Sequence, residues 1–162
     1  MVGNPQSLAD RLRSEGEKVI AAFDAYPEES REVTVYTEGA HWRLRDVLAH
    51  FVSTEIAFLQ LFKNIQLGGS GVPDDFSIDQ YNEKQVADMK EQPFVNLLES
   101  FTSTRAAMAE WVGELSESDL ELMGRHPFLG VTNLAEMIKL VYLHNNLHLR
   151  DIRKRVSNHD AQ

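Results

Sequence analysis

Apolar side chains recur at intervals of three and four residues along most of this chain, with polar side chains between them. This spacing is typical of helices that bury one face. It predicts four long helices, over residues 7–26, 43–67, 94–115 and 133–157, and a shorter one over residues 79–91. Residues 33–41 alternate only weakly, which predicts an extended linker with one short strand.

Glycine and proline mark the breaks between these helices. Pro27 follows the first helix, and the run Gly68-Gly69-Ser70-Gly71 ends the second. Pro93 separates residues 79–91 from the next helix, because proline breaks a helix interior. The pattern also predicts a short helical turn at residues 116–119 and a loop over residues 124–130.

Pattern and composition together indicate one helical domain over residues 1–162. The chain has 162 residues, 43% of them apolar and 25% charged, and it contains no repeat and no strand-rich block. Long amphipathic helices with connections of this kind predict an all-α fold, a four-helix bundle with short extra helical segments. Sites in such bundles are built from side chains on facing helices, so candidate chemistry is sought there.

The charge balance excludes some classes of function. With 16 basic and 25 acidic residues, the net charge of −9 offers no electrostatic source for binding nucleic acid. No apolar run approaches the roughly 18 residues of a membrane span, and the first residues lack an apolar signal core. We therefore expect a cytoplasmic protein without membrane association. Because cysteine is absent, a metal ion would need His, Asp or Glu ligands.

Two histidines in the last helix form the strongest chemical signal. His144 and His148 lie one helical turn apart, on the inward flank of that helix, where two imidazoles can share one metal ion. Such a pair also occurs on helices that bind no metal. Asn145 stands where a zinc protease would carry its glutamate base, so the protease motif is absent. The candidate for a third ligand is His50, at the edge of the apolar face of the second helix.

One carboxylate falls among the apolar positions of the second helix. Glu55 lies between Phe51 and Phe58, where a charge is costly unless it is paired or hydrogen-bonded. Three interpretations are open: Glu55 is a hydrogen-bond partner of a metal ligand, Glu55 contacts a substrate, or the helix is rotated from the predicted orientation. The remaining histidines, His41, His126 and His159, are not assigned to the site.

The motifs around these residues resemble a known family. The run Trp42-Arg43-Leu44-Arg45-Asp46-Val47-Leu48-Ala49-His50, followed by Glu55, is similar to the second-helix signature of the DinB-like superfamily. Leu143-His144-Asn145-Asn146-Leu147-His148 resembles its last-helix motif, and Ile78-Asp79-Gln80-Tyr81-Asn82 resembles the third helix of its mycothiol-dependent maleylpyruvate isomerase and thiol S-transferase branch. The resemblance implies an up-down-down-up bundle with a divalent metal ion held by His50, His144 and His148.

This resemblance also implies a reaction class. Members of the superfamily include S-transferases and an isomerase that use bacillithiol, mycothiol or glutathione. Many members carry Ser or Thr where this chain has Arg43, which could instead meet an anionic substrate. Asp151 could orient an imidazole, or could pair with Arg155 four residues later.

The leading hypothesis is a metal-dependent enzyme with an open three-histidine site. It would transfer a low-molecular-weight thiol to a small electrophile or hydrolyse a small molecule, and zinc is the first choice of metal, with nickel, copper and iron accepting the same ligands. The alternatives are a non-catalytic binding or sequestration protein with a vestigial metal site, and a purely structural helical module. A homodimer is compatible with the first two hypotheses.

Overall fold

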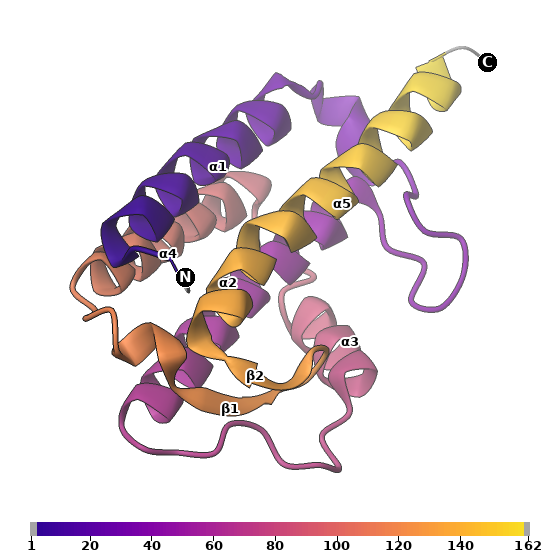
Figure 1. Ribbon diagram of the computed structural model, residues 1–162. Helices are drawn as coiled ribbons and strands as arrows, with labels where there is room; N and C mark the ends of the chain where they lie inside the picture. Colours follow the sequence, from indigo (N-terminus) through magenta and orange to yellow (C-terminus); the bar gives the residue numbers. More distant parts are fainter. Residues whose placement is uncertain (1–2, 161–162) are drawn as a thin grey trace.

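Four long helices form the bundle of the computed structural model, which describes the backbone of residues 3–160 and the side chains of residues 3–158 (Figure 1). They are α1 (Pro5–Ala25), α2 (Leu44–Gln66), α4 (Phe94–Gly113) and α5 (Leu134–Asp160). The shorter α3 (Ile78–Asp88) lies against α2, and two 3₁₀ turns span Glu28–Glu32 and Asp119–Glu121. No helix in this described part is long and apolar enough to cross a membrane.

The order of the helices is up-down-down-up, as expected. α1 runs up, α2 and α4 run down, and α5 runs up again, so α2 and α5 are antiparallel (Figure 1). Because α2 and α4 point the same way, the chain must return to the top of the bundle between them. Residues 67–93, including α3, make that return on one side of the bundle, and this leaves α3 close to the middle of α2.

Local signals account for the helix starts. Asn4 caps α1 by accepting a hydrogen bond from the Ser7 amide, so the helix begins two residues earlier than predicted. Ser77 caps α3 by accepting from the Gln80 amide. Asn133 accepts from the amide three residues ahead and begins α5 where it was predicted.

Residues 124–130, predicted as a loop, belong to a β-hairpin instead. Strands β1 (Met123–His126) and β2 (Gly130–Asn133) pair in antiparallel register, and Gly130 has a positive φ of 73° at the turn. Four-residue strands are too short for alternation to be visible in the sequence. In the linker 33–41, the expected short strand is a single bridge between Thr34 and Arg43.

The core consists of two apolar clusters separated by a polar layer. The first cluster is built around Leu12, Phe62, Met108, Val112, Leu134 and Val141, and the second around Val19, Phe23, Phe51, Phe101, Leu149 and Ile152. Between them each long helix contributes a buried polar residue: Glu15 from α1, Glu55 from α2, Arg105 from α4 and Asn145 from α5. The three candidate metal ligands lie beside this layer, on α2 and α5.

Candidate functional site

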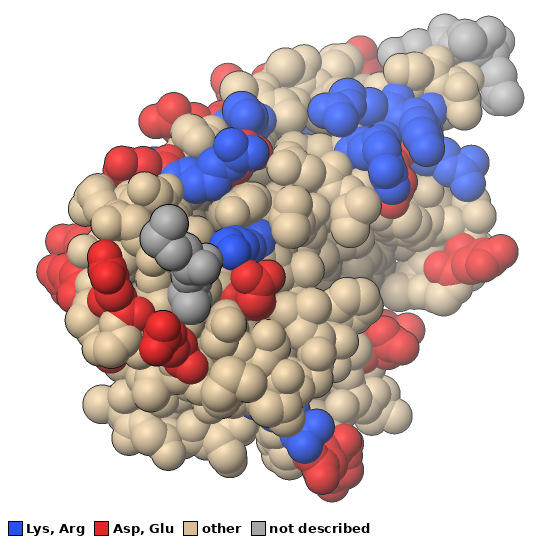
Figure 2. Space-filling model, in the orientation of Figure 1, with Lys and Arg blue, Asp and Glu red and all other residues tan. Residues whose placement is uncertain are grey.

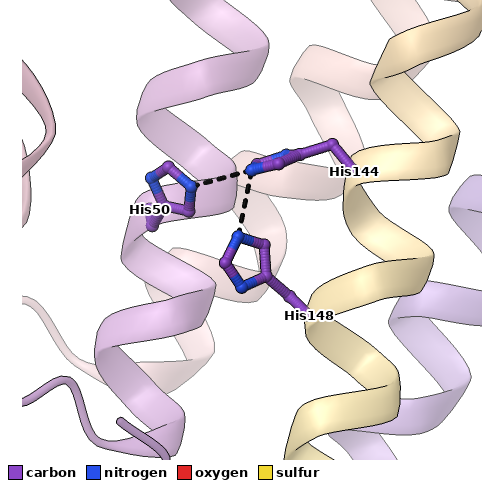
Figure 3. A group of neighbouring side chains, drawn as sticks. All are labelled: His50, His144 and His148. Atoms are coloured by element: carbon purple, nitrogen blue, oxygen red, sulfur yellow. Dashed lines mark hydrogen bonds between the residues drawn. The ribbon is translucent and has the colours of Figure 1, made fainter. Parts of the chain in front are cut away.

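Three imidazoles converge at the middle of the bundle. His50 from α2 and His144 and His148 from α5 point toward one another (Figure 3). The Nε2 atom of His144 lies 3.0 Å from that of His50 and 3.0 Å from that of His148. All three candidate ligand atoms lie within 4.8 Å of one another. The antiparallel packing of α2 on α5 therefore brings together the three residues that the sequence singled out.

A hydrogen-bond chain orients one of the three. The Tyr36 hydroxyl donates to Asp151 Oδ2 at 2.7 Å and lies 2.6 Å from His148 Nδ1. Because the hydroxyl gives its one proton to the carboxylate, its oxygen accepts from Nδ1–H, and the Nε2 of His148 keeps its lone pair for the cluster. Asp151 thus acts on the imidazole through Tyr36, while Arg155 donates to the Val35 carbonyl instead.

Burial keeps the three imidazoles neutral. It lowers the pKa of His144 to about 3 and that of His148 to about 4, and it places the pKa of His50 well below its ordinary value. The neighbouring imidazoles lower the pKa of His50 and His144 further. At neutral pH all three are therefore in the form that binds a metal ion.

The donor set fits a divalent cation. Two nitrogen ligands of one tetrahedral zinc ion lie about 3.3 Å apart, close to the two separations of 3.0 Å here. Neutral imidazoles suit zinc, nickel, copper and iron. With three protein ligands and no fourth among the described residues, the group has the composition of a catalytic site.

A cavity of about 380 Å³ lies beside one of the three histidines. His148 lines this cavity together with Tyr36 and Trp42, and the Trp42 ring lies 4.7 Å from the ring of His50. A second cavity, of about 330 Å³, begins one turn further along α2 at Thr54, whose hydroxyl donates to the His50 carbonyl. A small molecule can therefore approach the histidines from outside the bundle core.

Glu55 lies in the polar layer and forms no hydrogen bond with any of the three histidines. It makes a bidentate ion pair with Arg105, whose Nε lies 2.9 Å from Glu55 Oε2. Arg105 also donates to the Leu12 carbonyl and to Asn145 Oδ1. Gly16 makes room for this side chain, since a Cβ there would lie 2.7 Å from Arg105 Cγ. Glu55 thus sits in the apolar arc as predicted because α4 supplies its counter-charge.

The Arg43 side chain forms ion pairs with two carboxylates. Its guanidinium pairs with Asp46 and Glu32, and the Asp46 carboxylate also accepts from the Arg43 amide at the start of α2. Asp46 therefore accepts from the backbone at the start of α2, while the Arg43 guanidinium, which has no acceptor atom, donates to that carboxylate and holds it in place. Arg43 therefore has a structural role that does not require an anionic substrate.

The other histidines lie apart from the cluster. His41 is exposed, with a φ of 53°, and lines the same cavity as His148. His126 is buried in the hairpin, where its Nδ1 accepts from the amides of Phe128 and Leu129. His159 lies outside the residues whose side chains are described. Tyr36 was missed by the sequence reasoning, because nothing in the linker signals a contact with a residue 112 positions away.

Comparison with known proteins agrees with this architecture. Residues 11–152 match the sequence model of the DinB superfamily. Among solved structures, the chain is similar to YfiT from Bacillus subtilis, described as a probable metal-dependent hydrolase with an unusual four-helix bundle topology, with a TM-score of 0.77 and 15% identity over 96% of this chain and 87% of that one.

Two uncharacterised proteins share the fold. One, from Escherichia coli UTI89, has a TM-score of 0.75 and 13% identity over 97% of this chain and 95% of its own. The other, from Clostridium difficile 630, has a TM-score of 0.71 and 18% identity over 93% of this chain and 94% of its own. No curated protein sequence matches the chain.

Proposed function

Because this chain belongs to the DinB superfamily, we propose that His50, His144 and His148 bind one divalent metal ion and that the protein is a metal-dependent enzyme acting on a small molecule. The observation that carries the proposal is the convergence of three neutral imidazoles, from two helices, beside a cavity. Zinc is the first choice of metal, since a three-histidine set with an open position suits it.

The metal would supply Lewis-acid chemistry: a divalent cation at such a site lowers the pKa of a bound water or thiol toward neutrality. The chain's own residues provide the rest. Tyr36 and Asp151 hold His148 in one orientation and one tautomer. Trp42 covers one side of His50 and limits the access of water there.

Two nucleophiles are compatible with this site. Water would make the protein a hydrolase, the activity class ascribed to the structurally similar YfiT. A low-molecular-weight thiol would make it an S-transferase or a thiol-dependent isomerase. In that case the thiol must arrive as a second substrate, because the chain contains no cysteine.

Metal content tests the proposal. Untagged protein that has never met a metal column is analysed by elemental mass spectrometry, beside His144→Ala/His148→Ala and the control His41→Ala, which removes an exposed imidazole. We expect about one equivalent in the parent and in the control, and almost none in the double variant. Equal metal content in all three, or none in the parent after zinc is added, would refute the proposal and favour a binding protein.

The nucleophile is then identified with the metal-loaded protein. A panel of small esters, amides and alkylating electrophiles is incubated with and without bacillithiol, mycothiol or glutathione, and the products are separated by mass. Turnover without a thiol identifies a hydrolase, and turnover that depends on one thiol identifies a transferase or an isomerase. Either activity must be lost in His144→Ala/His148→Ala.

A further inference from the structure

Two cavities of different character lie near the three histidines. The first, which we call the apolar cavity, is lined mainly by Ala57, Phe58, Leu61, Val72, Phe76 and Tyr81 and measures about 330 Å³. The second, which we call the acidic cavity, measures about 380 Å³ and is lined by Trp42 and His148 together with the carboxylates Glu38, Asp79 and Glu83. Both volumes are in the range of small-ligand pockets.

The three histidines lie near both cavities. Thr54 and Phe58 follow His50 on successive turns of α2 and both line the apolar cavity. His148 lines the acidic cavity. Asn82 on α3 lines both, so the two cavities are neighbours on either side of this one side chain. One elongated molecule that spans both cavities would therefore contact His148.

The charged side chains that line the acidic cavity determine which ligand charge it favours. No Lys or Arg lines it, and among the described residues Glu38, Asp79 and Glu83 form no ion pair. Arg43 and Lys90 line a neighbouring depression, where Arg43 is already paired, and Arg150 lies near Tyr36 in the wall of the acidic cavity, where the three carboxylates outnumber it. On the face in Figure 2, Lys and Arg gather over the C-terminal half of α5 instead. This arrangement attracts a cation and repels an anion.

We propose that the substrate is a cationic amphiphile, with a hydrocarbon chain or ring in the apolar cavity and an ammonium group in the acidic cavity. The reacting bond would then lie between the two, beside the histidines. This inference rests on the proposed function, because it takes the histidines as the place of reaction. The binding preference itself does not depend on a metal ion, and it can be measured without one.

The test uses metal-free full-length protein and a series of simple probes. The n-alkylammonium ions from butyl to octyl are titrated while amide NMR shifts are recorded, beside alkyl carboxylates of the same lengths. We expect affinity for the ammonium series to rise about three- to fourfold with each methylene until the apolar cavity is filled. The carboxylates should bind at least about tenfold more weakly at low salt.

Two pairs of variants test the two cavities separately. Ala57→Trp fills the apolar cavity and should abolish the dependence on chain length, whereas Ala21→Trp on the exposed face of α1 should retain it. The triple variant Glu38→Gln/Asp79→Asn/Glu83→Gln should lose about tenfold in ammonium affinity. Its control, Glu17→Gln/Glu110→Gln/Glu117→Gln, changes the net charge equally at exposed sites and should bind like the parent.

The outcomes separate this inference from the proposed function. Equal binding of ammonium and carboxylate probes, or equal losses in each variant and its control, would overturn the inference even in a protein that binds zinc. Probe binding with the expected charge and length dependence would support it, whatever the metal content. A failure of the metal measurement would refute the proposed function and, with it, the role of the bound molecule as a substrate, but not the binding preference of the two cavities.

Discussion

The buried ion pair between Arg105 and Glu55 should be the most sensitive point of the bundle. Both side chains are almost fully buried, at 4% and 1% exposure, and Arg105 is the one residue of the polar layer that binds to three other helices. Arg105→Met keeps much of the apolar stem but removes every charged contact. It leaves the Glu55 carboxylate without a counter-charge, and it leaves Asn145 and the Leu12 carbonyl each without one donor.

The expected cost follows from that loss. Removing one partner of a buried pair costs about 3–5 kcal/mol, a large part of the roughly 5–15 kcal/mol by which a domain is stable. In Arg105→Met/Glu55→Leu no charge is left unpaired, so the double variant should be at least about 2 kcal/mol more stable than Arg105→Met alone. The sign of that difference identifies the unpaired carboxylate as the source of the cost.

Urea unfolding followed by far-UV circular dichroism measures these differences. The midpoints should move while the denaturant slopes stay the same, because the fold is retained. The control is Arg13→Met, which breaks an exposed pair with Asp10 and should change stability by less than about 0.5 kcal/mol. A cost below about 1 kcal/mol for Arg105→Met, or a double variant less stable than the single one, would refute the reasoning.

Three further predictions concern the site and its surroundings. Tyr36→Phe removes the acceptor of His148 Nδ1–H and should weaken zinc affinity about tenfold, measured by chelator competition, whereas Tyr26→Phe should not. The buried histidines have lower pKa values in the folded than in the unfolded chain, so the unfolded chain binds protons first and the free energy of unfolding should fall as the pH drops from about 6.5 to 4. His126, with a pKa of about 4, should contribute roughly 2 kcal/mol of that loss. In thermal melts at pH 7 and 4.5, His126→Phe should therefore show a smaller pH dependence than the parent. Gly71→Ala should destabilise by about 2 kcal/mol in urea titrations, since φ is +89° and a Cβ would overlap the backbone of Arg125; an unchanged midpoint would contradict this.

Helix periodicity predicts most of this fold, and the reason is visible in the packing. Each long helix presents to its neighbours an apolar face interrupted by one buried polar residue, and that face alone is enough to locate the helix in the sequence. The hairpin could not be predicted in this way. Gly71 from a distant loop bridges to Arg125 in β1, and Gly124 must lack a side chain because Ile65 packs against it. These are contacts between distant segments, and local pattern carries no sign of them.

The candidate site likewise combines features that the local sequence pattern predicts with features that it does not. The spacing of His144 and His148 on one helix is a local property, and it predicts that both imidazoles lie on one face, as they do in the structure. Tyr36 orients His148 from a linker without helical pattern, and Asn82 joins two cavities only because the return segment lays α3 beside α2. Both depend on how the chain crosses the bundle, which periodicity does not determine.

One contact between distant segments, the buried polar layer, can nevertheless be anticipated from the sequence. A polar residue in an apolar stripe needs a partner at the same height in the bundle, and Glu55 and Asn145 meet that need through Arg105. Their shared height sets the register of α2 against α5. At 1.5 Å per residue, His50 lies about 7.5 Å before Glu55 and His148 about 4.5 Å beyond Asn145. Because the two helices are antiparallel, both histidines lie on the same side of the polar layer. The ion pair that holds the core therefore also positions the histidines to meet.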